Sequence, residues 1–207
     1  MLKRTKGRLL LTLLVVTGMA GTLNNASIGS KERKFAVQHL KETKANLLKS
    51  VKGLSEAQLN FKPAADRWSV KECFYHIILA ENGLWGMFEA TMKNPSTPEK
   101  RSEIKVTDEE IVKMISNRSQ KAKAAEPMLP GKATWQNMTE AMAAFKASRG
   151  EHLKYVKNTT EDLRNHVFQL PFGSIDGYQF LLFMSAHSDR HTQQINEVKA
   201  DPNFPKQ

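Results

Sequence analysis

The sequence predicts an all-α protein, an up-down four-helix bundle with one or two short extra helical pieces. Apolar residues recur at the spacing of one helix face in four long stretches and in one shorter stretch. Proline and glycine separate these stretches, and no segment of alternating polarity is long enough to predict a strand. Four amphipathic helices joined by loops can bury their apolar faces against one another as a bundle.

The first long helix is expected over about residues 31–52. Its apolar residues share one face and are Leu40, Leu47, Leu48 and Val51. Gly53 follows as a terminator, because glycine readily adopts the left-handed conformation found after a helix C-terminus. Residues 54–67 contain Pro63 and small residues, and they are expected to form an irregular connector.

The second long helix is expected over residues 69–93. Ser69 and Glu72 form a capping box, in which each side chain accepts a hydrogen bond from the backbone N–H of the other residue. The apolar face is broad and comprises Val70, Cys73, Phe74, Ile77, Ile78, Leu84 and Phe88. Two prolines within residues 94–98 end this helix.

A second capping box, Thr107 with Glu110, begins a shorter helix that runs to about Arg118. Further prolines break the chain before the third long helix, which is expected over residues 137–157.

Residues 159–172 are expected to form a long connector, with a short helical turn over residues 161–166. Proline and glycine at its end block continuation. The last long helix is then expected over residues 175–199.

The first 26 residues have the pattern of a bacterial export signal. A basic segment ending at Arg8 precedes an apolar run over residues 9–16 and small residues up to Ala20. This run is shorter than the about 20 residues that span a bilayer. We expect cleavage after Ala20 or Ala26 and no stable membrane insertion, and the alternative is an uncleaved N-terminal anchor. The mature chain, residues 27–207, is then expected as one domain, periplasmic or secreted.

The net charge of +10 includes four positive charges in this signal, so +6 remains on the mature chain. Basic residues there are mixed with acidic ones and do not cluster with aromatic residues, as they would in a nucleic-acid binder. We therefore expect no nucleic-acid partner. Cys73 is the only cysteine, which excludes an intramolecular disulfide.

Three of the six histidines can form a site for a divalent metal ion. His187 and His191 are four residues apart in the last helix and project from the same side. His76 lies among apolar residues in the second helix, where a buried imidazole needs a partner. Three neutral imidazoles bind zinc, nickel or iron and leave a position open for water or substrate.

Other interpretations of these positions stay open. A histidine in a core can be purely structural. Glu72 and Cys73 precede His76 by about one turn and could reach the same site, although Glu72 also serves as a cap and Cys73 as a core residue. Glu81 points partly away from His76 but is a further acid/base candidate. The remaining histidines, expected at the surface or behind the site, are His39, His152 and His166.

Several stretches resemble the DinB/YfiT-like superfamily of bacterial metal-binding helical bundles. The two most specific are Trp68-Ser69-x-x-Glu72-x-x-x-His76 and His187-x-x-Arg190-His191-x-x-Gln194-Ile195. The resemblance covers residues 31–199. It implies a four-helix bundle, in many members a homodimer. It also implies metal ligands, which are His76, His187 and His191.

Members of this superfamily include thiol-dependent S-transferases and proteins described as metal-dependent hydrolases. The export signal argues against thiol transfer, because the thiols concerned are cytosolic. We therefore expect an exported metal-dependent hydrolase acting on an unidentified small molecule, with Glu72 or Glu81 as acid/base. Arg190 could steer an anionic group or could equally be a surface residue or form a salt bridge within the bundle. The alternatives are a thiol S-transferase relative, a non-catalytic periplasmic metal- or ligand-binding protein, and a dimer whose histidines bind no metal.

Overall fold

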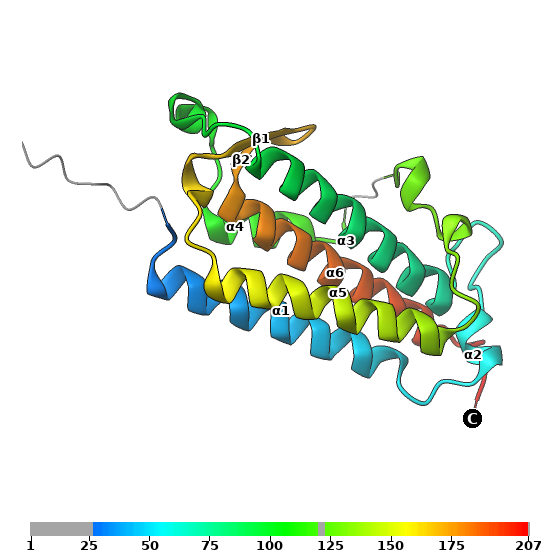
Figure 1. Ribbon diagram of the computed structural model, residues 1–207. Coiled ribbons are helices and arrows are strands. Elements are labelled where there is room, and N and C mark those ends of the chain that lie inside the picture. Colours follow the sequence, from blue (N-terminus) through cyan, green and yellow to red (C-terminus); the bar gives the residue numbers. More distant parts are fainter. Residues whose placement is uncertain (1–26, 120–122, 207) are drawn as a thin grey trace, which may run out of the picture.

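Four long helices make up about half of the described chain (Figure 1). The computed structural model describes residues 27–119 and 123–206, so the predicted signal, residues 1–26, lies outside the described residues. The four helices are α1 (Ser30–Val51), α3 (Val70–Met92), α5 (Met138–Asn158) and α6 (Gly177–Lys199). No helix in this described part is long and apolar enough to cross a membrane. The prediction of an all-α four-helix bundle is confirmed.

The directions of the long helices follow the path of the chain between them. α1 and α6 run one way along the bundle, and α3 and α5 run the other way (Figure 1). Contacts between α3 and α5 advance together along both helices: Phe74 packs edge-on against Phe145, and Trp85 stacks on His152 farther along. The connection between α3 and α5 runs back along the bundle, so these two helices are parallel and strict up-down alternation is interrupted there.

Short elements occupy the connections. The connector before α3, expected to be irregular, contains the five-residue helix α2 (Glu56–Asn60). The connection from α3 to α5 carries α4 (Asp108–Ser116), which packs on α6 and buries Ile111 completely. The remaining helical pieces are 3₁₀ turns at Pro98–Glu103, Glu126–Met128, Pro130–Lys132 and Leu163–Asn165.

Capping side chains begin the helices where the sequence predicts them. Ser69 Oγ accepts a hydrogen bond from the backbone N–H of Glu72. In return, the Glu72 carboxylate accepts one from the backbone N–H of Ser69. The same exchange links Thr107 with Glu110 at α4. These bonds satisfy backbone N–H groups that have no partner inside the first turn of a helix.

A two-stranded hairpin precedes α6, and here the prediction of a connector without strands is wrong. β1 (Val167–Leu170) pairs antiparallel with β2 (Gly173–Asp176), so that Phe168 lies opposite Ile175. Each strand has only four residues, which is too short for a visible alternation of polarity. Gly173 has φ +128°, a conformation that favours glycine.

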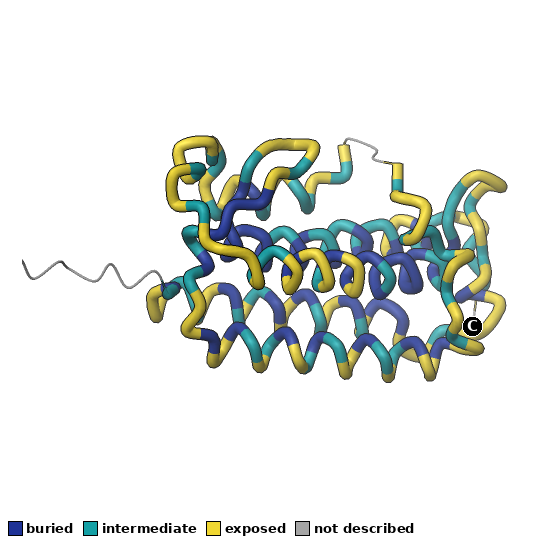
Figure 2. The backbone as a smooth tube through the Cα atoms, turned by 45° about the horizontal axis from the view of Figure 1, so that its top comes forward, coloured by how far each residue is buried: buried dark blue, intermediate teal, exposed yellow. Residues whose placement is uncertain are grey.

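Buried residues follow the inner faces of the long helices (Figure 2). They form two apolar clusters along the bundle. One joins α3, the hairpin and α6 through Phe88, Phe168 and Phe180. The other contains Phe74, and Trp68 packs against it from the start of α3.

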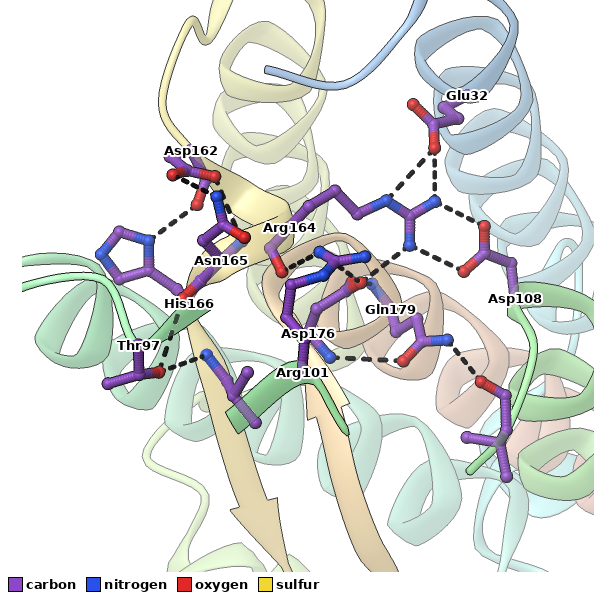
Figure 3. Close-up of polar contacts among 12 residues, drawn as sticks. Glu32, Thr97, Arg101, Asp108, Asp162, Arg164, Asn165, His166, Asp176 and Gln179 are labelled. Atoms are coloured by element: carbon purple, nitrogen blue, oxygen red, sulfur yellow. Dashed lines mark hydrogen bonds and ion pairs between the residues drawn. The ribbon is translucent and has the colours of Figure 1, made fainter. Parts of the chain in front are cut away.

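An ion cluster joins the ends of three helices beside the hairpin (Figure 3). The guanidinium of Arg164 pairs with Glu32 in the first turn of α1, Asp108 at the start of α4 and Asp176 at the N-cap of α6. It also lies over the ring of Tyr178, 4.3 Å from the ring centroid. One cation therefore ties α1, α4 and α6 together at this end of the bundle.

Candidate metal centre

Three imidazoles meet between α3 and α6. His76 comes from α3, while His187 and His191 lie one turn apart on α6, which runs antiparallel to α3. Each residue offers one ring nitrogen, and these three atoms all lie within 4.8 Å of one another. His76 and His191 are buried, and His187 is half-buried. The structure thus brings together the three residues that the sequence singles out.

Hydrogen bonds at Nδ1 fix the tautomers of two of these rings. Nδ1 of His76 lies 2.7 Å from the backbone oxygen of Met128, and a carbonyl oxygen can only accept. Nδ1 of His191 lies 2.8 Å from Oε1 of Gln194, which also accepts from a guanidinium N–H of Arg118. Both Nδ1 atoms therefore carry the proton of the neutral ring, and both Nε2 atoms present a lone pair.

The two Nε2 atoms face each other at a distance of 3.1 Å, between His76 and His191. Two lone pairs at this distance repel unless a cation or a proton lies between them. Ligand atoms bound at about 2.0–2.1 Å to one tetrahedral ion lie about 3.3 Å apart, close to the observed distance. The donor set, the tautomers and the spacing therefore all fit a divalent ion such as zinc.

The surroundings keep the imidazoles neutral. Burial lowers the pKa of His76, although its bond with Met128 works in the opposite direction. Burial, the neighbouring His76 and the charge of Arg190 lower the pKa of His187 to about 3. Burial and the other two imidazoles also hold the pKa of His191 far below its usual range. Neutral imidazole is the form that binds a metal, so the site is in its binding state at neutral pH.

Aromatic rings cover the cluster on two sides. The centroid of the Trp68 ring lies 4.7 Å from that of His76 and 6.1 Å from that of His191. Phe183 on α6 lies 6.3 Å from His187, measured in the same way. These rings reduce the access of water and thereby strengthen electrostatic interactions within the site.

The predicted acid/base residues are engaged elsewhere. Glu72 accepts from the backbone N–H of Ser69 and pairs with Lys62 at 2.7 Å, so its carboxylate faces the surface at the start of α3. Glu81 is buried and forms a two-bond ion pair with Arg149. Burial alone would raise the pKa of Glu81, but Arg149 and His152 outweigh it and lower the pKa to about 2.

Other residues that the sequence places near the site have separate surroundings. Cys73 is fully buried in the apolar core, and burial raises the pKa of its thiol to about 12. A surface pocket of about 250 Å³ is lined by Glu72 and Tyr75 rather than by the three imidazoles. The guanidinium of Arg190 donates to the backbone oxygen of Asn117 at the end of α4.

Two histidines expected at the surface or behind the site are interior residues with partners of their own. His152 bonds to Glu81 at 3.0 Å and stacks on Trp85. His166 lies between the backbone oxygens of Asp162 and Asn94. The surface interpretation is wrong for both, because each ring finds hydrogen-bonding partners inside the fold.

The fold and the site define a class of protein, a helical bundle in which two antiparallel helices present three imidazoles. The chain belongs to the DinB superfamily, whose family model matches residues 39–195.

Two relatives from Bacillus subtilis are similar to the chain. The uncharacterized protein YuaE of strain 168 is 24% identical over 171 residues, which cover 76% of this chain and 93% of YuaE. The solved structure of YfiT is described as "a probable metal-dependent hydrolase with an unusual four-helix bundle topology". It superposes with a TM-score of 0.58 at 17% identity, covering 86% of this chain and 92% of YfiT, and so shows the shared fold.

Proposed function

We propose that this protein is an exported metal-dependent hydrolase that binds one divalent ion through His76, His187 and His191. The observation that supports this most is the 3.1 Å distance between the Nε2 atoms of His76 and His191, whose Nδ1 atoms are both bonded to acceptor oxygens. The description of YfiT, which has the same fold, as a probable metal-dependent hydrolase supports the reaction class. Zinc, nickel and iron(II) are all suited to imidazole ligands.

The chain prepares a site with three protein ligands, which leaves a position for water and substrate. A divalent ion bound there supplies Lewis acidity and lowers the pKa of a coordinated water toward about 7. Met128 and Gln194 hold the protons on the Nδ1 atoms, so that the Nε2 atoms stay available as ligands. Trp68 and Phe183 shield the imidazoles from bulk water.

The general base is not assigned to Glu72 or to Glu81. Glu72 caps α3 and pairs with a lysine at the surface. Glu81 is ion-paired, and its pKa of about 2 makes its carboxylate a weak base. A hydrolytic reaction would therefore depend chiefly on the ion and its coordinated water.

The engagement of Glu72 and Glu81 in other contacts favours a second candidate function. A non-catalytic periplasmic protein that binds a metal ion needs the three imidazoles but needs no general base. Both functions predict one bound ion per chain, and they differ only in turnover.

The deciding experiment uses mature protein loaded with zinc, nickel or iron(II) and assays it against chromogenic carboxylic esters, amides and phosphate esters. The matched controls are EDTA-treated protein and His191→Ala. Turnover that is lost in both controls supports the hydrolase. One bound equivalent of metal without turnover on any substrate supports the binding protein, and a failure to bind any of these metals contradicts both.

A further inference from the structure

A polar network is buried in the middle of the bundle, beside the imidazoles. Its centre is Arg149 on α5, which is 0% exposed, and Glu81 on α3, which is 1% exposed. The Nε and Nη2 atoms of Arg149 donate to the two carboxylate oxygens of Glu81 at 2.7 and 2.5 Å. Nη2 also donates to Ser188 Oγ on α6 at 2.8 Å, and that hydroxyl donates to Glu81 at 3.1 Å.

Arg149 reaches α1 as well. Its Nη1 atom donates to the backbone oxygen of Leu40 at 2.9 Å and to Thr43 Oγ1 at 2.8 Å. The Thr43 hydroxyl lies 2.9 Å from that of Ser185, one turn before Ser188 on α6. A single guanidinium thus joins all four long helices of the bundle.

The network is attached to both helices that carry the candidate ligands. Ser188 directly follows His187 on α6, and Glu81 lies five residues after His76 on α3. A shift of α6 by one residue along α3 would move its imidazoles by about 1.5 Å. A metal site, in contrast, requires ligand distances within about 0.2 Å of their ideal values. The bonds through Ser188 oppose such a shift at the level of the site.

A buried ion pair is poor evidence for a gain in stability. Removing two charges from water is costly, and well-packed apolar residues often replace such a pair without loss. Apolar side chains, however, would not fix the position of α6 along α3, because their contacts have little direction. Hydrogen bonds with defined donors and acceptors do fix it.

We propose that Arg149 is a positioning residue for the metal centre, because it holds α6 against α3 so that His187 and His191 meet His76. This inference rests on the proposed function, since the property that Arg149 controls is the binding of the divalent ion. Glu81 then serves as the anchor of Arg149 on α3, and Ser188 as its anchor on α6.

The test compares Arg149→Met with Arg164→Met as a matched control. Arg164 also pairs with buried and half-buried carboxylates and joins three helices, but it lies at the hairpin end of the bundle (Figure 3). Zinc affinity is measured by competition with a chromophoric chelator, and the visible absorption of bound Co²⁺ reports coordination geometry. Thermal unfolding of both variants records the general loss of stability.

Arg149→Met is expected to weaken zinc binding by about 10- to 100-fold, the range typical of residues that orient metal ligands. It should also change the Co²⁺ spectrum. Arg149→Lys, which keeps the charge but has fewer donors, should lie between Arg149→Met and wild type. Arg164→Met should lower the unfolding temperature and leave the affinity and spectrum as in wild type. Equal affinities in all variants, or an equal loss in both methionine variants, overturns the proposal.

Two further measurements cover the other outcomes. If Arg149→Met does not fold, Ser188→Ala removes the link to α6 while Arg149 and Glu81 stay paired. Ser188→Ala should then weaken zinc binding, and a zinc affinity equal to that of wild type overturns the proposal. If wild type binds no metal, the proposed function fails on its own. NMR of the metal-free protein then tests the positioning role through the tautomers of His76 and His191. Both rings should be protonated at Nδ1 in wild type and in Arg164→Met, and this tautomer should change in Arg149→Lys. Unchanged tautomers in Arg149→Lys overturn it.

Discussion

Replacing His191 with leucine is expected to have opposite effects on the stability of the metal-free and the metal-loaded protein. In the metal-free protein, the Nδ1 bonds to Met128 and Gln194 leave the Nε2 atoms of His76 and His191 facing each other at 3.1 Å as two acceptors. An unsatisfied buried acceptor costs about 1–3 kcal/mol, while the hydrogen bond to Gln194 that leucine removes contributes about 0.5–1.5 kcal/mol. The free energy of unfolding of the variant should therefore lie between about 0.5 kcal/mol below and about 2.5 kcal/mol above that of wild type.

Zinc should reverse this order. At 100 times its Kd, zinc adds about 2.7 kcal/mol to the stability of wild type, and the variant has lost one of its ligands. A change of 1 kcal/mol shifts the Tm of a domain of this size by about 2–4 °C, so the Tm of wild type should rise by about 5–11 °C. Calorimetry in EDTA and in zinc measures both effects, with His39→Leu as a control outside the site. The reasoning is refuted if His191→Leu is clearly less stable than wild type in EDTA and if zinc raises its Tm as much as that of wild type.

Acid should destabilise the metal-free protein. The unfolded chain takes up protons at histidine below about pH 6.5, whereas His187 in the folded state stays neutral until about pH 3. Urea unfolding from pH 7 to pH 4 should therefore show a falling free energy of unfolding, and a flat profile contradicts the lowered pKa values. Trp68→Ala should lower the free energy of unfolding by at most about 3–5 kcal/mol. It should also weaken zinc binding, because the ring packs on His76. An unchanged zinc affinity in calorimetric titration would show that the ring contributes to the core alone. A C-terminally tagged chain should be recovered outside the cytoplasm and, by mass spectrometry, begin after Ala20 or Ala26, whereas full-length protein confined to the cytosol contradicts export.

Local signals in the sequence account for most of the helices. Each long helix repeats its apolar residues at helical spacing, and α3 begins directly after the capping residue Ser69. The parallel arrangement of α3 and α5 has no such signal, because it depends on the path of the connection that contains α4. The hairpin before α6 is equally hidden, since its strands pair with each other over only four residues each.

The candidate site could be predicted in part. The four-residue spacing on α6 is enough to pair His187 with His191, but His76 joins them only because α3 packs against α6. Met128 holds the His76 tautomer through its backbone oxygen, which any residue could supply, so its identity gives no signal. Arg149 does leave one: it stands one turn after Phe145 on the apolar face of α5, where a charge requires a buried partner.

The metal content of the purified mature protein tests the central claim most directly. Elemental analysis after reconstitution with zinc should find one equivalent of zinc in wild type. The His166→Ala variant should also bind one equivalent, because His166 lies near the hairpin. The variant with alanine at positions 76, 187 and 191 should bind none. A full equivalent of tightly bound metal in that triple variant, or none in wild type, would contradict the assignment of the three imidazoles as a metal centre.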